Sequence, residues 1–132
     1  MLSLRSLILP LSLVFGLSLV ACDGGEEDGD DDAGEEGGNC NADQTARVDT
    51  VLALTPDEAN GATVFANTCG IGSCHGADGN SGTGPALSDE IPDYSSDALG
   101  CLLLTGVGTM PSQAGLSDQD LADVIAYAEA TF

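Results

Sequence analysis

The sequence has 132 residues, of which 22 are acidic and two are cationic, for a formal net charge of −20 at pH 7. It contains no lysine, and its arginines are Arg5 and Arg47. Nucleic-acid binding is therefore excluded, because phosphate contacts need several lysine or arginine side chains. Electrostatic steering by such a chain favours a basic partner.

The N-terminal residues 1–21 have the features of a secretion signal. Arg5 precedes an apolar run over residues 7–20. A membrane-spanning helix needs about 20 uninterrupted apolar residues, whereas Pro10, Gly16 and several serines interrupt this run. We therefore expect a signal peptide that is removed on export.

Cys22 follows the signal and ends the stretch Leu-Val-Ala-Cys. This stretch resembles the lipobox of bacterial lipoproteins. The resemblance implies that Cys22 is acylated, becomes the first residue of the mature protein and anchors it to a membrane. The alternative is an ordinary signal peptide that leaves Cys22 as a free thiol.

Residues 22–39 form the next segment and, after the cysteine, are almost entirely Asp, Glu, Gly and Ala. Such a composition offers too little apolar surface to fold, so we predict a disordered acidic tether with a reach of about 20 to 25 Å. Residues 40–54 are a connecting segment. Its apolar part, residues 48–54, either packs on the following domain or begins an extra helix.

The first clear helix signal begins at Thr55. Thr55 and Glu58 have the spacing of a capping box, and Pro56 suits the first helical position. These signals predict a helix over about residues 56–68 that ends directly before Cys69.

The stretch Cys-Gly-Ile-Gly-Ser-Cys-His then places four residues between Cys69 and Cys74 and continues with His75. The ordinary haem-attachment motif has two residues between its cysteines. From the spacing alone, a haem site, a zinc site and a disulfide loop are all open. Gly70 and Gly72 lie inside the spacer, and both can adopt positive φ and so absorb its extra length.

A second helix is predicted over residues 97–105. Ser96 can cap its start, and Gly106 can end it. Met110 follows in a glycine-rich loop directly before Pro111. A loop of irregular backbone seldom supplies a core side chain, but it can direct a side chain such as that of Met110 toward a binding site.

The last helix is predicted over residues 116–132. Ser117 can cap it, and Leu116 and Leu121 have the spacing of a hydrophobic staple. Apolar residues then recur with helical periodicity, so one face of this helix should be buried.

Counting of reactive residues narrows the alternatives for the cysteine stretch. If Cys22 is lipidated, four cysteines remain, and thioethers at Cys69 and Cys74 would leave Cys40 and Cys101 as a pair available for a disulfide. Two disulfides would balance equally well.

After removal of the signal, His75 and Met110 are the single histidine and the single methionine. Histidine with methionine is the axial pair that raises the reduction potential of electron-transfer haem proteins.

Several features together resemble the small class I c-type cytochromes over roughly residues 55–132. The features are Gly61 and Phe65 upstream of Cys69, the Cys74-His75-Gly76 triplet, the Gly84-Pro85-Ala86-Leu87 loop, and the Gly108-Thr109-Met110-Pro111 loop followed by a closing helix. The resemblance implies an all-α cytochrome c fold. About three short helices and long loops would wrap around one covalent haem c, and we expect the domain without haem to be largely unfolded.

The resemblance also assigns roles to individual residues. Cys69 and Cys74 would form the haem thioethers, and His75 and Met110 would be the axial ligands of the iron. Pro85 and Leu87 would pack against the haem, with the Pro85 carbonyl accepting a hydrogen bond from His75. Gly61 would let the first and last helices approach closely near Phe65 and Tyr127. The long spacer departs from the family, and attachment through Cys74 alone is an alternative to two thioethers.

These features predict a one-electron carrier and not an enzyme, because Met110 would close the coordination position that catalysis needs. We expect a monomeric periplasmic protein, anchored to a bacterial membrane through Cys22. Its partners would be redox proteins with a basic docking surface.

Two rival interpretations involve no haem. A zinc site would use Cys69, Cys74, His75 and one of Cys40 or Cys101. A disulfide between Cys69 and Cys74 would instead stabilise an anchored binding module. Neither accounts for the Met110 loop.

Overall fold

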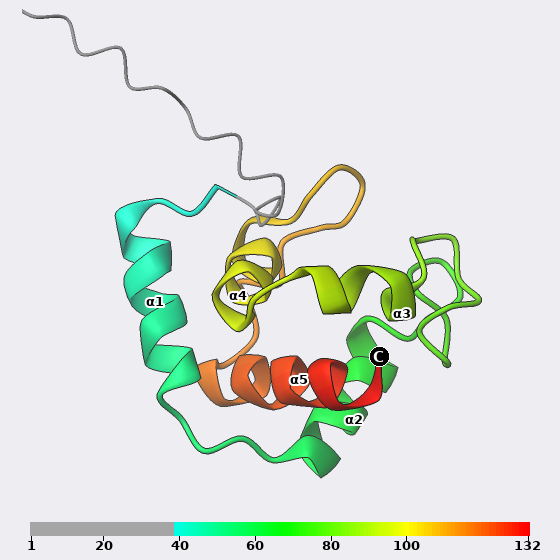
Figure 1. The fold of residues 1–132 in the computed structure, drawn as a ribbon, viewed down its shortest axis with the longest axis horizontal. Helices are drawn as coiled ribbons and strands as arrows, with labels where there is room; N and C mark the ends of the chain where they lie inside the picture. Colours follow the sequence, from blue (N-terminus) through cyan, green and yellow to red (C-terminus); the bar gives the residue numbers. More distant parts are fainter. Residues whose placement is uncertain (1–38) are drawn as a thin grey trace, which may run out of the picture. The chain divides into compact units, whose positions relative to one another are not determined.

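The structure is a computed structural model, and it describes residues 39–132. The predicted signal peptide, Cys22 and the tether up to residue 38 lie outside the described residues. Within the described range the chain forms α-helices and one 3-10 turn, with no strand (Figure 1). The elements are α1 (Ala42–Leu52), α2 (Glu58–Thr68), α3 (Leu87–Glu90), η1 (Ile91–Asp93), α4 (Ser96–Thr105) and α5 (Asp118–Thr131).

The expected all-α architecture is confirmed, but the number of helices is larger than expected. The three predicted helices correspond to α2, α4 and α5. The additional helices are α1, which lies in the connecting segment, and the short α3. None of the helices in residues 39–132 combines the length and apolar character that crossing a bilayer requires.

Two of the three predicted helix caps were placed at the wrong residue. Asp57 and not Thr55 caps α2, because its carboxylate accepts the amide protons of Ala59 and Asn60 at 3.0 and 3.3 Å. Ser95 and not Ser96 caps α4.

The Ser96 hydroxyl instead donates to Glu129 of α5 at 2.6 Å. A tertiary contact therefore decides which of the two neighbouring serines serves as the cap. The predictions of Ser117 as the cap of α5 and of Gly106 as the end of α4 are confirmed.

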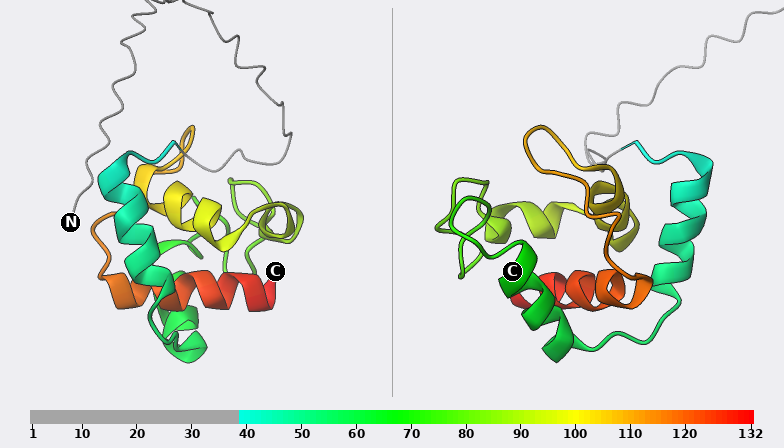
Figure 2. Two further views of the ribbon diagram at one scale, coloured as in Figure 1. Left: turned by 60° about the vertical axis from the view of Figure 1, so that its left-hand side comes forward. Right: turned by 180° about the vertical axis from the view of Figure 1, so that it is seen from behind.

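Helices α2 and α5 lie against each other (Figures 1 and 2), and Gly61 is at their contact. A Cβ atom at Gly61 would lie 2.8 Å from the Tyr127 Cβ and would overlap the backbone carbonyl of Asp123. The Phe65 ring lies 5.5 Å from the Tyr127 ring and 5.4 Å from the Phe132 ring, centroid to centroid. The expected close approach at Gly61 is thus confirmed.

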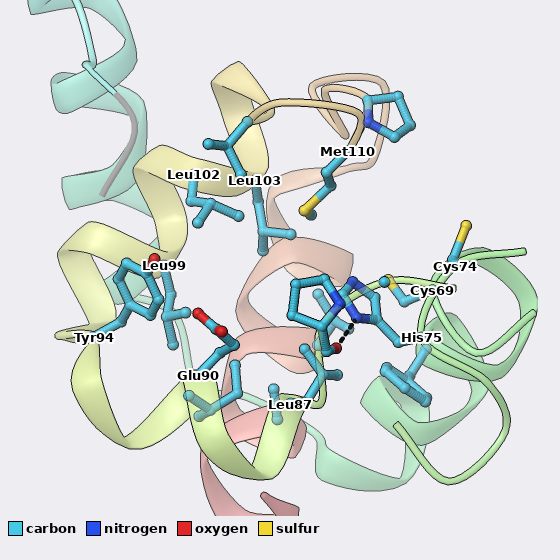
Figure 3. A pocket seen from close by; sticks show the side chains of 18 of the residues that line it. Cys69, Cys74, His75, Leu87, Glu90, Tyr94, Leu99, Leu102, Leu103 and Met110 are labelled. Atoms are coloured by element: carbon cyan, nitrogen blue, oxygen red, sulfur yellow. Dashed lines mark hydrogen bonds between the residues drawn. The ribbon is translucent and has the colours of Figure 1, made fainter. Parts of the chain in front are cut away.

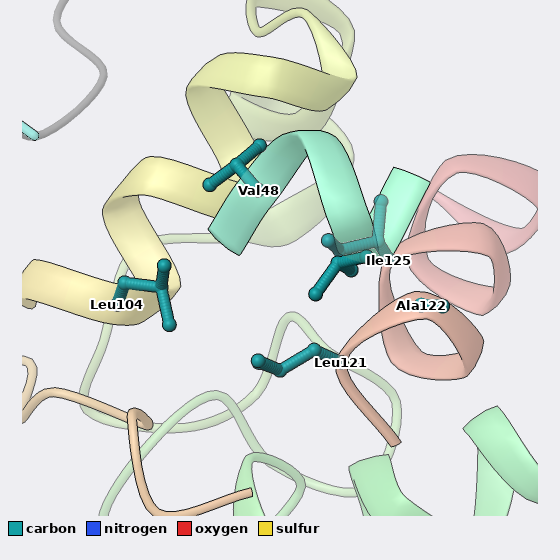
Figure 4. Close-up of a cluster of buried hydrophobic side chains, with 6 residues drawn as sticks. Val48, Leu104, Leu121, Ala122 and Ile125 are labelled. Atoms are coloured by element: carbon teal, nitrogen blue, oxygen red, sulfur yellow. The ribbon is translucent and has the colours of Figure 1, made fainter. Parts of the chain in front are cut away.

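Helix α1 contributes to the main hydrophobic core. The core cluster is drawn in Figure 4 and consists of Val48, Val51, Leu104, Leu121, Ala122 and Ile125. Val48 and Val51 come from α1 and are 3% and 1% exposed. Gly100 of α4 packs directly against Val48, since a Cβ there would lie 2.9 Å from the Val48 Cγ1. The segment over residues 40–54 therefore contains a helix that packs on the domain.

A disulfide links the start of this segment to α4. Cys40 and Cys101 are bonded in the structure, with their Cα atoms 5.6 Å apart. The bond joins residues with a sequence separation of 61, and the loop it closes includes α1, α2 and the cysteine stretch. Cross-links of this kind typically stabilise a domain by about 2 to 4 kcal/mol.

A buried carboxylate holds the start of α2 against α5. Asp123 is 1% exposed, and its Oδ1 accepts hydrogen bonds from the Asp57 backbone N–H and from Gln119 Nε2, both at 2.7 Å. Its Oδ2 accepts one from Asn60 Nδ2 at 2.7 Å. Burial alone would raise the pKa of Asp123, but these three donors together lower the pKa below its ordinary value.

Replacing Asp123 by asparagine should cost about 2 to 3 kcal/mol of unfolding free energy, because a hydrogen-bonded carboxylate is lost and an N–H group then faces a donor. Urea denaturation would measure this loss. Asp49→Asn, at an exposed position of α1, is the matched control and should change stability by less than about 0.5 kcal/mol.

The cost of Asp123→Asn should also depend on pH. Because the folded pKa is depressed, the carboxylate stabilises the protein fully above the unfolded pKa of about 3.9 and loses this contribution as the pH falls through the folded value. The stability difference between wild type and variant should therefore shrink below about pH 4. A difference that stays constant down to the acid transition would contradict this account.

Candidate functional site

A cavity of about 390 Å³ opens between the helices and two long loops. This volume lies in the range of cofactor and small-ligand sites. Most of its lining is apolar and comes from α2, α3, η1, α4 and α5. The apolar lining residues include Phe65, Leu87, Ile91, Leu99, Leu102, Leu103, Val124, Ile125 and Ala128 (Figure 3).

The sequence-predicted site residues converge on this cavity. Cys69, Cys74, His75, Pro85, Leu87 and Met110 all line it. Cys40 and Cys101 do not, because they form the disulfide at the other face of α4 from the lining residues Leu99, Leu102 and Leu103. Cys22 lies outside the described residues.

The cysteine stretch is wound into a compact turn. The amides of Cys74 and Gly76 both donate to the Ile71 carbonyl, at 2.9 and 3.1 Å, and the His75 amide donates to the Cys69 carbonyl at 3.0 Å. These bonds bring Cys69, Cys74 and His75 to one side of the cavity despite the four-residue spacer.

Gly70 and Gly72 do not use positive φ to absorb the extra length of the spacer. Among the described glycines, positive φ occurs at Gly76 and Gly79, after the second cysteine, and at Gly106 and Gly108. Gly70 serves a different purpose, since a Cβ there would lie 3.1 Å from the Phe65 ring. The spacer is absorbed by hydrogen-bonded turns with ordinary φ values.

His75 is held in a single orientation. Its Nδ1 lies 3.0 Å from the Pro85 carbonyl oxygen, which is the hydrogen bond expected from the resemblance. Gly84 packs on the ring, because a Cβ there would lie 3.1 Å from the His75 Nδ1. A proton donated from Nδ1 to Pro85 leaves the lone pair of Nε2 free for a metal ion.

Met110 enters the cavity from a different part of the chain. Gly106, at φ 74°, ends α4, and Gly108, at φ 56°, lets the backbone turn so that Val107 and Met110 pair through both of their amides. Figure 3 shows the Met110 sulfur directed into the cavity that His75 also lines.

Cys69 and Cys74 are free thiols in the structure. Burial, with a smaller contribution from the nearby Cys74, raises the pKa of Cys69 to about 11. Cys69 is therefore a neutral thiol at physiological pH, which is unsuitable for a nucleophilic or redox-sensing cysteine.

The rival zinc site is not supported by this geometry. In residues 39–132, no three His, Cys, Asp or Glu side chains lie together in a way that could hold a metal ion. The fourth zinc ligand was expected to be Cys40 or Cys101, and each is engaged by the other.

The described cavity also contains polar residues that the motifs do not indicate. Glu90, Tyr94 and Thr83 line it. Glu90 and Tyr94 belong to the short α3–η1 region, which is too brief to show a helical period, so the sequence carried no signal for them.

The donor set fits a haem group attached through two cysteines. A flat apolar macrocycle requires an apolar slot, two thiols at one edge, and one ligand on each face. The cavity offers the slot, Cys69 and Cys74 on a single turn, an oriented imidazole at His75 and a thioether sulfur at Met110.

Comparison with known proteins agrees with this fit. Residues 56–127, more than half of the chain, match the family model described as cytochrome C oxidase, cbb3-type, subunit III. No curated protein and no solved structure matches the chain. The matched range contains all the cavity residues named above except Ala128, and it excludes α1 and Cys40.

Proposed function

The chain belongs to the cytochrome c domain family of cbb3-type oxidase subunit III, and we propose that it binds a single haem whose iron is ligated by His75 and Met110. As a member of this family it carries covalent haem c and acts as an electron carrier, not an enzyme. When bound, the haem supplies an iron that alternates between the ferrous and ferric states. The protein's part is to attach the group, fix its ligands and keep water away.

The observation that carries this proposal is the convergence of His75 and Met110 on one apolar cavity from separate elements. The hydrogen bond to the Pro85 carbonyl holds the imidazole and raises its basicity as a ligand. Both ligands lie on backbone fixed by hydrogen bonds within the loops, so they would be retained in both oxidation states. A small change in geometry between the two states favours fast electron transfer.

Cys69 and Cys74 are proposed to form the two thioether bonds. Both thiols line the cavity on the turn that precedes His75. Pro85, Leu87 and the leucines of α4 line the cavity and would pack against the haem. Such packing would keep water away from the bound group.

The remaining parts of the proposal concern where the carrier works. We place it in the periplasm of a bacterium as a monomer, with a signal peptide at residues 1–21 and a lipid on Cys22. The acidic tether over residues 22–39 would hold the domain of residues 55–132 near the membrane. The net charge of −20 supports redox partners that dock through a basic surface. The anchored carrier would transfer electrons within a respiratory chain.

The test is an optical spectrum of the exported protein, produced with a c-type haem maturation system and measured oxidised and reduced. We expect a sharp reduced α band and a haem that resists acid-acetone extraction. A colourless protein would contradict the proposal and favour the disulfide-stabilised binding module without haem.

Single substitutions then count the thioethers. Cys69→Ala and Cys74→Ala should each leave one bond, which shifts the α band of the denatured reduced haem to longer wavelength, and the double variant should release its haem on extraction. Cys101→Ala, outside the cavity, is the matched control and should leave the band in place. If Cys69→Ala leaves the band unchanged, the haem is attached through Cys74 alone.

A further inference from the structure

The loop that presents Met110 has two stems. One stem is the end of α4, which Gly106 terminates. The other is the irregular segment over residues 111–117 that leads into α5. The second stem is held to the first by the Gln113 amide, which donates to the Leu103 carbonyl at 2.7 Å, and by the Ser112 hydroxyl, which donates to the Leu104 carbonyl at 2.7 Å.

Arg47 binds the second stem from α1. Its Nε donates to the Asp118 Oδ1 at 2.8 Å, its Nη1 to the Ala114 carbonyl at 2.8 Å and its Nη2 to the Leu116 carbonyl at 2.7 Å. All three guanidinium nitrogens are therefore engaged, and two of them bind backbone carbonyls that lie outside any helix. Lysine could not reproduce this fork, because it has a single nitrogen.

Helix α1 also binds the first stem. The Cys40–Cys101 disulfide joins the residue before its cap to α4, and Val48 packs on Gly100 of α4. Helix α1 is thus connected to both stems of the methionine loop. The disulfide at Cys40, just before the helix, joins it to α4, and Arg47 joins it to the second stem. This helix lies outside the range matched by the family model.

We propose that Arg47 is a positioning residue for the iron ligand: it clamps the second stem of the Met110 loop to α1 and so keeps the methionine sulfur in the cavity. The role rests on the proposed ligation by Met110. An exposed ion pair would contribute little, but the Arg47 side chain is 29% exposed and its backbone contacts persist without the Asp118 charge.

Imidazole binding to the oxidised holoprotein tests the proposal. Imidazole reaches the ferric iron only when Met110 has left, so its apparent affinity rises with the fraction of open loop. For Arg47→Gln we expect binding about tenfold tighter than wild type, which corresponds to about 1.4 kcal/mol. The imidazole affinity of Arg47→Lys should fall between those of wild type and Arg47→Gln. This variant also provides the test if Arg47→Gln does not fold. Asp118→Asn keeps an oxygen acceptor for Nε and both carbonyl contacts, and should change the affinity by less than about threefold.

Asp123→Asn is the matched control for loss of overall stability, because Asp123 joins α2 to α5 and none of its own hydrogen-bond partners lies in the loop or its stems. Its imidazole affinity should stay within about twofold of wild type. Hydrogen exchange supplies a second readout. The amides of Met110 and Leu116 are bonded within the loop and its second stem, and the Gln113 amide joins the second stem to α4. All three should exchange faster in Arg47→Gln but not in Asp123→Asn.

Two results would overturn the proposal. One is an unchanged imidazole affinity in both Arg47 variants, and the other is an equal increase in Asp123→Asn. Failure of the ligand assignment has a different signature, in which Met110→Ala binds imidazole no more tightly than wild type. In that case, amide exchange at Gln113 and Leu116 still tests whether Arg47 holds the second stem. Faster exchange in Arg47→Gln would support this role, and unchanged exchange would overturn it.

Discussion

Replacing Met110 by alanine is expected to lower the reduction potential by on the order of 100 mV or more, because axial ligands set haem potentials over a range of about 0.8 V and the thioether sulfur favours the reduced state. Met110 is the single methionine after residue 1, and its sulfur points into the cavity. The described chain offers no second histidine or methionine to replace it. A redox titration of the purified holoprotein would measure the change.

The control for this substitution is Val107→Ala. Val107 lies in the same loop and is 50% exposed, but its side chain offers no ligand atom. Its potential should stay close to that of the wild type. Carbon monoxide provides an independent check, since it should bind the reduced Met110→Ala protein and not the Val107→Ala protein. An unaltered potential together with no carbon monoxide binding would mean that Met110 is not a ligand.

Gly61→Ala is expected to prevent the normal packing of α2 on α5. The added Cβ would overlap the Asp123 carbonyl and lie 2.8 Å from the Tyr127 Cβ. Neither a backbone carbonyl nor a Cβ can rotate away, so the two helices would have to separate. Overpacking typically costs about 1 to 3 kcal/mol, and a clash with backbone belongs at or above the upper end of this range.

Gly115→Ala is the matched control, because nothing lies within 4 Å of a Cβ at that position. Denaturant unfolding of both variants would give the comparison, and the yield of holoprotein would show whether Gly61→Ala still folds around its haem. Equal stability of the two variants would show that α2 and α5 do not need the close approach seen in the structure.

The motif residues of the site could be predicted because they lie close together in the sequence. Cys74, His75 and the loop containing Pro85 resemble the motifs of c-type cytochromes, and the structure brings them to one cavity. The glycine conformations could not be predicted in the same way. Positive φ at Gly76 and Gly79, and not at Gly70 or Gly72, depends on which carbonyls the turn amides reach.

Helix boundaries depended on contacts between distant residues. Ser95 and Ser96 are equivalent as caps in the sequence, and the contact between Ser96 and Glu129 separates them. Helix α1 did carry a local signal, the capping box formed by Asn41 and Gln44, which the composition of the acidic segment before it obscured.

The burial of Asp123 had no signal in the sequence. It lies among acidic residues that look like the solvated face of a helix, and only the donors supplied by α2 and Gln119 make a buried carboxylate stable there. The same is true of Arg47, whose partners lie about 70 residues further along the chain.

The hydrogen bonds of Arg47 allow the detachment of α1 to be measured by proteolysis. Trypsin cleaves after lysine and arginine, and beyond Arg5 the chain offers it only the bond after Arg47. That bond lies within α1, and its arginine is held by three hydrogen bonds, so cleavage requires the helix to detach and unwind first. Where opening and closing are fast, the rate of a single tryptic cut measures the population of molecules in which α1 is detached.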